Sequence, residues 1–184
     1  MGVDAVSAWE AIGRSDEWYT PAYIFDALEI NFDLDVAAPA EGPRHVPARD
    51  WISKGSLGIR WQGFIWMNPP FGGRNGLVPW LNKFFTHGNG IALTPDRTSA
   101  PWFQDAMKRA DAILFVAPKI KFERPDGTLG KIPGTGTALF AAGSEGVAAL
   151  KRGHGTIGTF VKLQKSPPMQ AYEFFQARHE RTDQ

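Results

Sequence analysis

The segment Asn68-Pro69-Pro70-Phe71 combines residue types that can act on a planar amino group. Its two consecutive prolines forbid continuation of a strand ladder and hold the backbone extended and rigid. The Asn68 side chain and the Pro69 carbonyl then point beyond the strand end as two fixed acceptors, one for each hydrogen of an NH₂ group. Accepting both hydrogens favours a tetrahedral nitrogen and positions it for attack on a methyl group. Phe71 adds a face on which a ring can stack, although the same tripeptide also occurs as a simple tight turn.

The elements around this segment are expected to place it at the end of a buried strand. The apolar run at residues 64–67 predicts a strand of the kind found in parallel sheets. Gly72-Gly73 lets the following backbone pass close to a ligand. We predict further strands at residues 31–38, 90–94, 112–116, 137–141 and 156–163, and helices at residues 20–28, 77–85, 99–110 and 146–152. Residues 40–62 are expected to be irregular, and residues 123–136 to form a Gly/Pro-rich loop. This alternation predicts an α/β fold with a mainly parallel sheet and helices on both faces.

Three of the predicted strands end in polar or proline-containing turns, at residues 35–39, 68–71 and 94–98. Ligands of parallel α/β sheets bind outside the carboxyl ends of the strands, so the three turns indicate one site at one edge. Ahead of the first strand, Thr20 is expected to cap a helix that has Pro21 at its first position.

Length, composition and charge narrow the class of protein. The 184 residues predict one domain, with a lead-in at 1–18, a folded unit at 19–165 and a tail at 166–184. The absence of cysteine excludes disulfides, and four scattered histidines indicate no metal site. Residues 1–50 carry ten acids and three bases, whereas the remainder carries nine acids and seventeen bases, a balance that suits a polyphosphate partner or ordinary solvated lysines. No apolar run is long enough to span a bilayer, so we expect a cytoplasmic protein.

Several motifs in order resemble one family of enzymes. Asn68-Pro-Pro-Phe71 is similar to the Asn/Asp-Pro-Pro-Tyr/Phe signature of amino-methyltransferases, and Thr20-Pro21 and Leu34–Ala38 resemble the segments that form the cofactor turn. Pro95, Thr98, Trp102 and Phe103, followed by Lys119–Phe122, complete the pattern. Residues 16–143 therefore resemble the compact DNA N6-adenine methyltransferases of phages and prophages.

The resemblance implies a Rossmann-like class I methyltransferase without a separate target-recognition domain, acting with S-adenosylmethionine on an adenine flipped out of DNA. The catalytic residues it implies are Asn68, Pro69, Pro70 and Phe71. The cofactor-binding residues it implies are Thr20, Pro21, Asp35, Ala37 and Asn68. The candidate DNA contacts are Arg97, Thr98, Trp102, Lys119, Phe122 and Arg124.

Other interpretations of these residues stay open at this level. Asp35 is either a cofactor ligand or the cap of a turn, and Phe122 is either a stacking partner for the base or a core residue. The usual Gly-rich cofactor loop is missing, and the ribose has only Glu41 or Asp50 as an acidic candidate. Two alternatives therefore remain: a methyltransferase of the same motif class acting on RNA or on a protein glutamine, and a non-catalytic DNA-binding protein on a degenerate methyltransferase scaffold.

Overall fold

A computed structural model describes residues 18–71 and 76–164. The expected lead-in (apart from Trp18), Gly72-Gly73 and the tail lie outside these ranges. In chain order the elements are α1 (Ala22–Leu28), β1 (Phe32–Asp35), β2 (Ala48–Trp51), the 3₁₀ helix η1 (Ser56–Gly58), β3 (Ile65–Met67), α2 (Leu77–His87), β4 (Gly90–Asp96), α3 (Pro101–Arg109), β5 (Ala112–Val116), β6 (Gly136–Ala142), α4 (Ser144–Arg152) and β7 (Gly158–Lys162).

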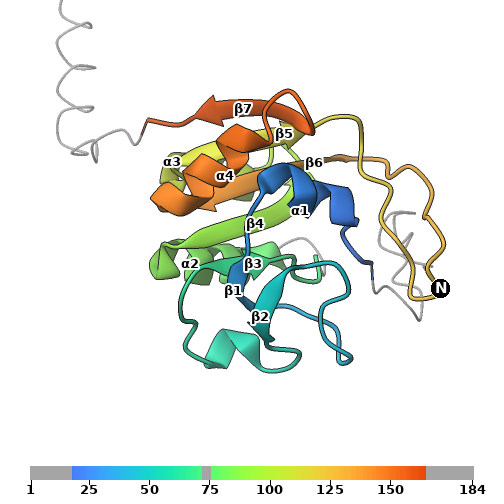
Figure 1. The fold of residues 1–184 in the computed structure, drawn as a ribbon. Coiled ribbons are helices and arrows are strands. Elements are labelled where there is room, and N and C mark those ends of the chain that lie inside the picture. The colour runs from blue at the N-terminus through green and yellow to red at the C-terminus, as the bar shows by residue number, and fades with distance from the viewer. Residues whose placement is uncertain (1–17, 72–75, 165–184) are drawn as a thin grey trace, which may run out of the picture.

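The strands form one mixed sheet with the order β2-β1-β3-β4-β6-β5-β7 (Figure 1). β2, β1, β3 and β4 run parallel to one another. β6 lies antiparallel between β4 and β5, and β7 is antiparallel to β5 at the edge. The α/β class is confirmed, but the sheet is less parallel than expected. An apolar run indicates that a strand is buried and does not indicate its direction.

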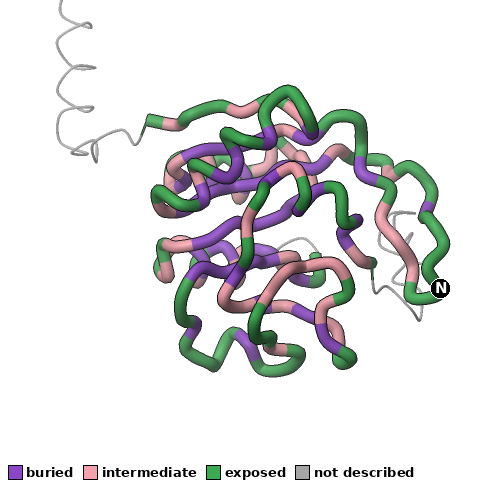
Figure 2. The backbone as a smooth tube through the Cα atoms, viewed as in Figure 1, coloured by how far each residue is buried: buried purple, intermediate pink, exposed green. Residues whose placement is uncertain are grey.

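Helices cover both faces of the sheet and divide the core into two layers. α1 and α4 contact each other on one face, and α2 and α3 contact each other on the other. Each layer has its own cluster of buried side chains, so the central strands are buried on both sides (Figure 2). This arrangement leaves the ends of the strands as the part of the sheet that a ligand can reach.

Most of the aromatic residues are packed in the core. Phe32 stacks on Phe64 with ring centroids 5.2 Å apart, and Phe25 meets Trp66 edge to face at 4.9 Å. These four rings lie between α1 and the parallel half of the sheet. Trp66 is 1 % exposed and immediately precedes the end of β3, so this packing fixes the strand from which Asn68 projects.

Two local expectations about α1 and β4 were wrong. α1 begins at Ala22, and its N-cap is Pro21 without a side-chain hydrogen bond, so Thr20 does not cap the helix. β4 continues through Pro95 to Asp96 instead of stopping before the proline. β3 pairs with β4 only as far as Ala92, so beyond that residue β4 has one strand neighbour, β6. A proline is tolerated where a strand is unpaired on one side.

A third expectation, that residues 40–62 are irregular, was also wrong. β2 and η1 both lie in this range. β2 is an edge strand with three exposed residues and one half-buried residue. It therefore shows neither the alternation nor the apolar run by which strands are identified in a sequence.

Candidate active site

The order of the strands creates a crevice between β1 and β3. From β1 the chain moves to β2 on one side and then returns to β3 on the other. Open α/β sheets bind ligands at such a switch point, outside the carboxyl ends of the strands. Asp35 is the last residue of β1 and Asn68 follows the last residue of β3. Both line a cleft of about 2100 Å³.

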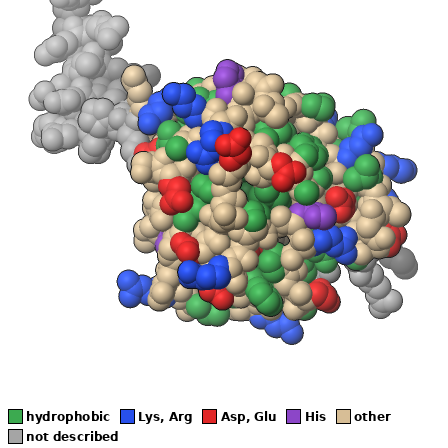
Figure 3. Space-filling model, in the orientation of Figure 1, with side chains coloured by type: hydrophobic (Ala, Val, Ile, Leu, Met, Phe, Trp, Pro, Cys, Tyr) green, Lys and Arg blue, Asp and Glu red, His purple; other side chains and the backbone are tan. Residues whose placement is uncertain are grey.

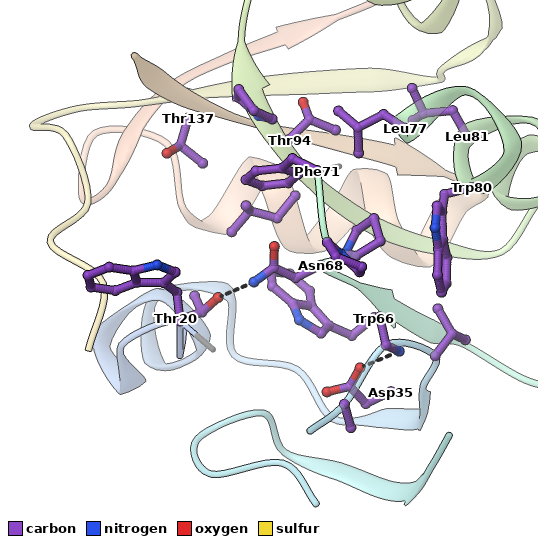
Figure 4. Close-up of a pocket in the computed structure, with 18 of the residues that line it drawn as sticks. Thr20, Asp35, Trp66, Asn68, Phe71, Leu77, Trp80, Leu81, Thr94 and Thr137 are labelled. Atoms are coloured by element: carbon purple, nitrogen blue, oxygen red, sulfur yellow. Dashed lines mark hydrogen bonds between the residues drawn. The ribbon is translucent and has the colours of Figure 1, made fainter. Parts of the chain in front are cut away.

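The size of the cleft suits more than one small ligand. Pockets for a single small molecule typically measure about 300–1000 Å³. In Figure 4 Asn68 lies between Asp35 on one side and Phe71 and Thr94 on the other. The cleft can therefore hold two ligands that meet at Asn68, one on the side of β1 and one on the side of Phe71.

The Asn68 amide is oriented by a residue from the start of α1. Its Nδ2 donates to Thr20 Oγ1 at 3.4 Å, and its amide oxygen points to the side of Phe71 (Figure 4). Pro69 is buried behind it, whereas Pro70 is exposed and Phe71 is 40 % exposed. The amide oxygen is thus presented to the cleft, and the ring of Phe71 is accessible beside it.

Thr20 is buried, with 3 % of its surface exposed, so its hydroxyl is a fixed partner for Asn68. For the methyl transfer that the resemblance implies, we expect Thr20→Val to lower kcat about 3- to 10-fold, because one neutral hydrogen bond contributes about 1 kcal/mol. Thr20→Ser keeps the hydroxyl and is expected to keep kcat near its wild-type value. The measurement is steady-state kinetics with cofactor concentration varied. A change in cofactor KM with an unchanged kcat would contradict the positioning role and favour a direct cofactor contact.

Asp35 is a buried carboxylate, and few hydrogen bonds from neighbouring groups stabilise its charge. It is 3 % exposed, and among the described residues the hydrogen bond to its side chain comes from the Ala37 N–H to Oδ1 at 3.0 Å. Burial raises the pKa of Asp35 to about 6, against the opposing effect of the Ala37 hydrogen bond. A cation bound in the cleft would stabilise the ionised form. Asp35 thus caps its own turn as one interpretation predicted, and its role as a cofactor ligand stays a prediction.

On the other side of Asn68, Thr94 carries an unsatisfied polar atom. Thr94 is fully buried and lines the cleft, and within the described ranges its hydroxyl oxygen has no hydrogen-bond partner. Thr137, on the neighbouring strand β6, is also buried and lines the cleft. Buried polar groups without partners are uncommon in native proteins and often mark a ligand site.

The structure brings most of the predicted residues to this cleft. Those that line it are Thr20, Asp35, Ala37, Asn68, Pro69, Pro70, Phe71, Arg97, Trp102, Phe122 and Arg124. Phe122 also packs against the core, and its role as a stacking partner for the base stays a prediction.

Pro21, Thr98 and Lys119 are not among the residues that line the cleft. The Thr98 carbonyl accepts a hydrogen bond from the Gln104 side chain at 2.6 Å. Lys119 Nζ donates to the Pro133 and Gly134 carbonyls at 3.3 and 2.8 Å. Of the two acids considered for the ribose, neither Glu41 nor Asp50 lines the cleft.

One wall of the cleft comes from a segment that the sequence did not identify. Residues 52–58, which comprise the connection after β2 and η1 itself, line it together with Trp80 of α2. Lys83 Nζ donates to the carbonyls of Ser56 and Leu57 at 2.7 and 2.9 Å and also to that of Ile59, which holds this turn to α2. Trp61 stacks on Trp80 with centroids 6.2 Å apart. The tryptophans in residues 61–80 are the feature of the sequence that could have indicated this wall. Aromatic residues in that range are, however, equally typical of a protein core.

The family model of DNA N-6-adenine-methyltransferase (Dam) matches residues 11–149. No curated protein and no solved structure matches the chain. In the described part of the chain, no group of three or more acidic, histidine or cysteine side chains is arranged to hold a metal ion, and no helix is long and apolar enough to cross a membrane.

Proposed function

Because the chain belongs to the DNA N-6-adenine-methyltransferase (Dam) family, it methylates adenine in DNA, and we propose that Asn68-Pro69-Pro70-Phe71 is its catalytic centre. Methyl transfer by this family implies S-adenosylmethionine as the methyl donor. The observation that carries the proposal is the placement of Asp35 and Asn68 on the two strands of the switch point, in one cleft large enough for cofactor and base. No observation supports RNA or a protein as the substrate in place of DNA. None supports a protein that only binds DNA without methylating it.

Asn68 and Pro69 act by accepting hydrogen bonds. The Thr20 contact leaves the Asn68 amide oxygen free to accept one hydrogen of the adenine amino group, and the Pro69 carbonyl accepts the other. Both acceptors are held by a rigid backbone, so they need little reorganisation during the reaction. They draw electron density towards the amino nitrogen and hold its lone pair in line for attack. The bound cofactor supplies the electrophilic methyl group.

The residues on the β1 side fit a cationic cofactor. Asp35 is buried and short of hydrogen bonds, so its raised pKa shows a carboxylate that would gain from a positive ligand. S-adenosylmethionine carries a sulfonium and an ammonium group, and Asp35 would hold one of them. Ala37 lies on the same turn, and Thr20, just ahead of α1, lines the cleft and contacts Asn68. Pro21 does not line the cleft, and its carbonyl accepts a backbone hydrogen bond from Ile24 at 3.2 Å.

The residues on the other side fit a flipped adenine. A base taken out of the duplex is held by stacking between side chains. Phe71 can stack on one face of the adenine, and Phe122 is the candidate for its opposite face. Thr94 lies near Phe71 (Figure 4), and its buried hydroxyl has no partner among the described residues, so a polar atom of the base that reaches it would satisfy it. Arg97, Trp102 and Arg124 also line the cleft and are candidates for contacts with the DNA backbone.

Transfer of labelled methyl groups tests the proposal. Plasmid DNA is incubated with the protein and methyl-labelled S-adenosylmethionine, digested to nucleosides and separated. We expect label in N6-methyldeoxyadenosine and none in cytosine derivatives. RNA and a glutamine-containing peptide run in parallel are expected to stay unlabelled. Label in either of those substrates alone would contradict the proposal.

A further inference from the structure

The connection between β5 and β6, residues 117–135, forms an arm along the rim of the cleft (Figure 1). Leu129 and Ile132 on this arm are 59 % and 63 % exposed, more than any other large apolar side chain in the described residues. Ile132 lines the cleft and Leu129 does not. Leaving an apolar side chain in water at the cleft is unfavourable, so Ile132 indicates a surface that is covered in a complex.

The arm is held in place at its base by residues from the start of the chain. Tyr19 and Glu123 exchange two backbone hydrogen bonds, of 2.9 and 3.0 Å. The Glu123 carboxylate also accepts from His45 Nε2 at 2.8 Å. The Gly130 N–H donates to the Phe122 carbonyl at 2.7 Å, and a side chain at Gly130 would collide with the ring of Trp18.

Further contacts hold the outer part of the arm. Arg44 donates to the Arg124 and Pro125 carbonyls at 2.9 and 2.6 Å. Arg124 in turn donates to the Leu129 carbonyl at 3.2 Å. Lys119 closes the far end through the Pro133 and Gly134 carbonyls. The position of Ile132 is therefore fixed from both sides, and its β-branched side chain is itself stiff.

The charge around Ile132 suits a polyanion. Lys119, Lys121, Arg124 and Lys131 all lie on the arm, and Lys131 lines the cleft beside Ile132. Figure 3 shows Lys and Arg side chains among hydrophobic ones at the edge of the molecule where the arm lies. A second group of basic residues, Lys151, Arg152 and Lys162, lies elsewhere, on α4 and β7. There Arg152 donates to the Leu28 carbonyl at 2.8 Å.

We propose that Ile132 is the wedge that enters the DNA duplex beside the flipped adenine, with Lys131 on a neighbouring phosphate. This inference rests on the proposed function. Extruding a base costs a few kcal/mol of stacking and pairing, and an apolar side chain inserted into the base stack offsets part of that cost. Ile132 meets the requirements, because it is exposed, apolar and held on a braced arm at the mouth of the cleft that takes the base.

Ile132→Ala tests the wedge on two duplexes built around a site that the wild-type protein methylates. In the first the target adenine is paired with thymine, and in the second it lies opposite an abasic site. We expect kcat/KM to fall about 10-fold on the paired duplex and less than about 3-fold on the second, because an unpaired base needs less help to leave the stack. Leu129→Ala, an equally exposed change outside the cleft, is expected to stay within about 2-fold of wild type on both.

The outcomes separate the two levels of inference. If the wild-type protein methylates no site in the plasmid assay, from which the duplex sequence is taken, the proposed function itself is refuted. If the wild type is active, unchanged kinetics of Ile132→Ala on the paired duplex overturn the wedge. An equal loss on both duplexes also overturns it and makes Ile132 a wall of the base pocket. Circular dichroism and cofactor binding check that the variant is folded, which we expect because the side chain is exposed.

Discussion

Replacing Asn68 by alanine is expected to reduce kcat about 100- to 1000-fold, while cofactor affinity stays within about 3-fold of wild type. The substitution removes one of the two acceptors for the amino hydrogens, and a fixed hydrogen-bonding group of this kind typically contributes that much to the transition state. The binding of the cofactor depends mainly on the β1 side of the cleft, where Asp35 is unchanged. The measurement is single-turnover methyl transfer beside calorimetric titration with S-adenosylmethionine.

Two further variants sharpen this result. Asn68→Asp keeps an oxygen acceptor at the same position and is expected to retain more activity than Asn68→Ala. Asn31→Ala changes an exposed asparagine ahead of β1, away from the cleft, and is expected to behave as wild type. An Asn68→Ala protein with normal kcat would refute the catalytic assignment. An equal loss of cofactor binding would make Asn68 mainly a cofactor ligand.

Replacing Asp35 by asparagine is expected to weaken the binding of S-adenosylmethionine about 10- to 100-fold, because it removes a buried charge that pairs with a cationic ligand. The amide keeps the shape of the side chain and an acceptor for the Ala37 N–H, so the fold is expected to be preserved. Calorimetry with the cofactor measures the loss, and Asp26→Asn on the exposed side of α1 is the matched control. Unchanged affinity would show that Asp35 only caps its turn.

The pH dependence of the same variant gives an independent test. The pKa of Asp35 is raised from 3.8 to about 6, so the folded protein holds this proton more tightly than the unfolded chain does. The free energy of unfolding without cofactor therefore falls as the pH rises from about 4 to about 6, by at most about 3 kcal/mol. Asp35→Asn lacks this dependence and is expected to be the more stable protein above pH 6 in urea titrations.

Cofactor binding is expected to have the opposite dependence on pH. Only the ionised carboxylate attracts a cation, so wild-type affinity rises as the pH increases through about 6 and then levels off. In Asp35→Asn the affinity is expected to change little over this range. A wild-type affinity that is constant between pH 5 and 8 would contradict the role of the Asp35 charge.

The sequence predicted the centre of the site because that centre depends on local chemistry. Two prolines after an all-apolar strand determine a rigid strand end, and β3 ends directly before Asn68 as expected. Asp35 was identified for the same reason, as an acid at the end of a strand with a turn behind it. Helices α2, α3 and α4 were predicted close to their bounds because their apolar faces repeat with the helical period.

The remaining features depend on contacts between distant segments. β2 is exposed, and its apolar and polar residues do not alternate as in a typical strand. Only its pairing with β1 therefore defines it as a strand. The partner of Thr20 is a residue 48 positions later, and no local pattern distinguishes a hydroxyl that orients Asn68 from one that caps a helix. The bracing of the β5–β6 arm by Tyr19, Arg44 and His45 is likewise a property of the folded chain.

A crystal structure of the protein with a methylatable DNA duplex and a non-reactive cofactor analogue tests the central claim most directly. The distances to be measured run from the target adenine N6 to the Asn68 side-chain oxygen and to the Pro69 carbonyl oxygen. We predict both at about 3 Å, with the analogue on the Asp35 side of Asn68 and the base beside Phe71. An adenine bound elsewhere, or an N6 beyond hydrogen-bond distance of both oxygens, would contradict the account.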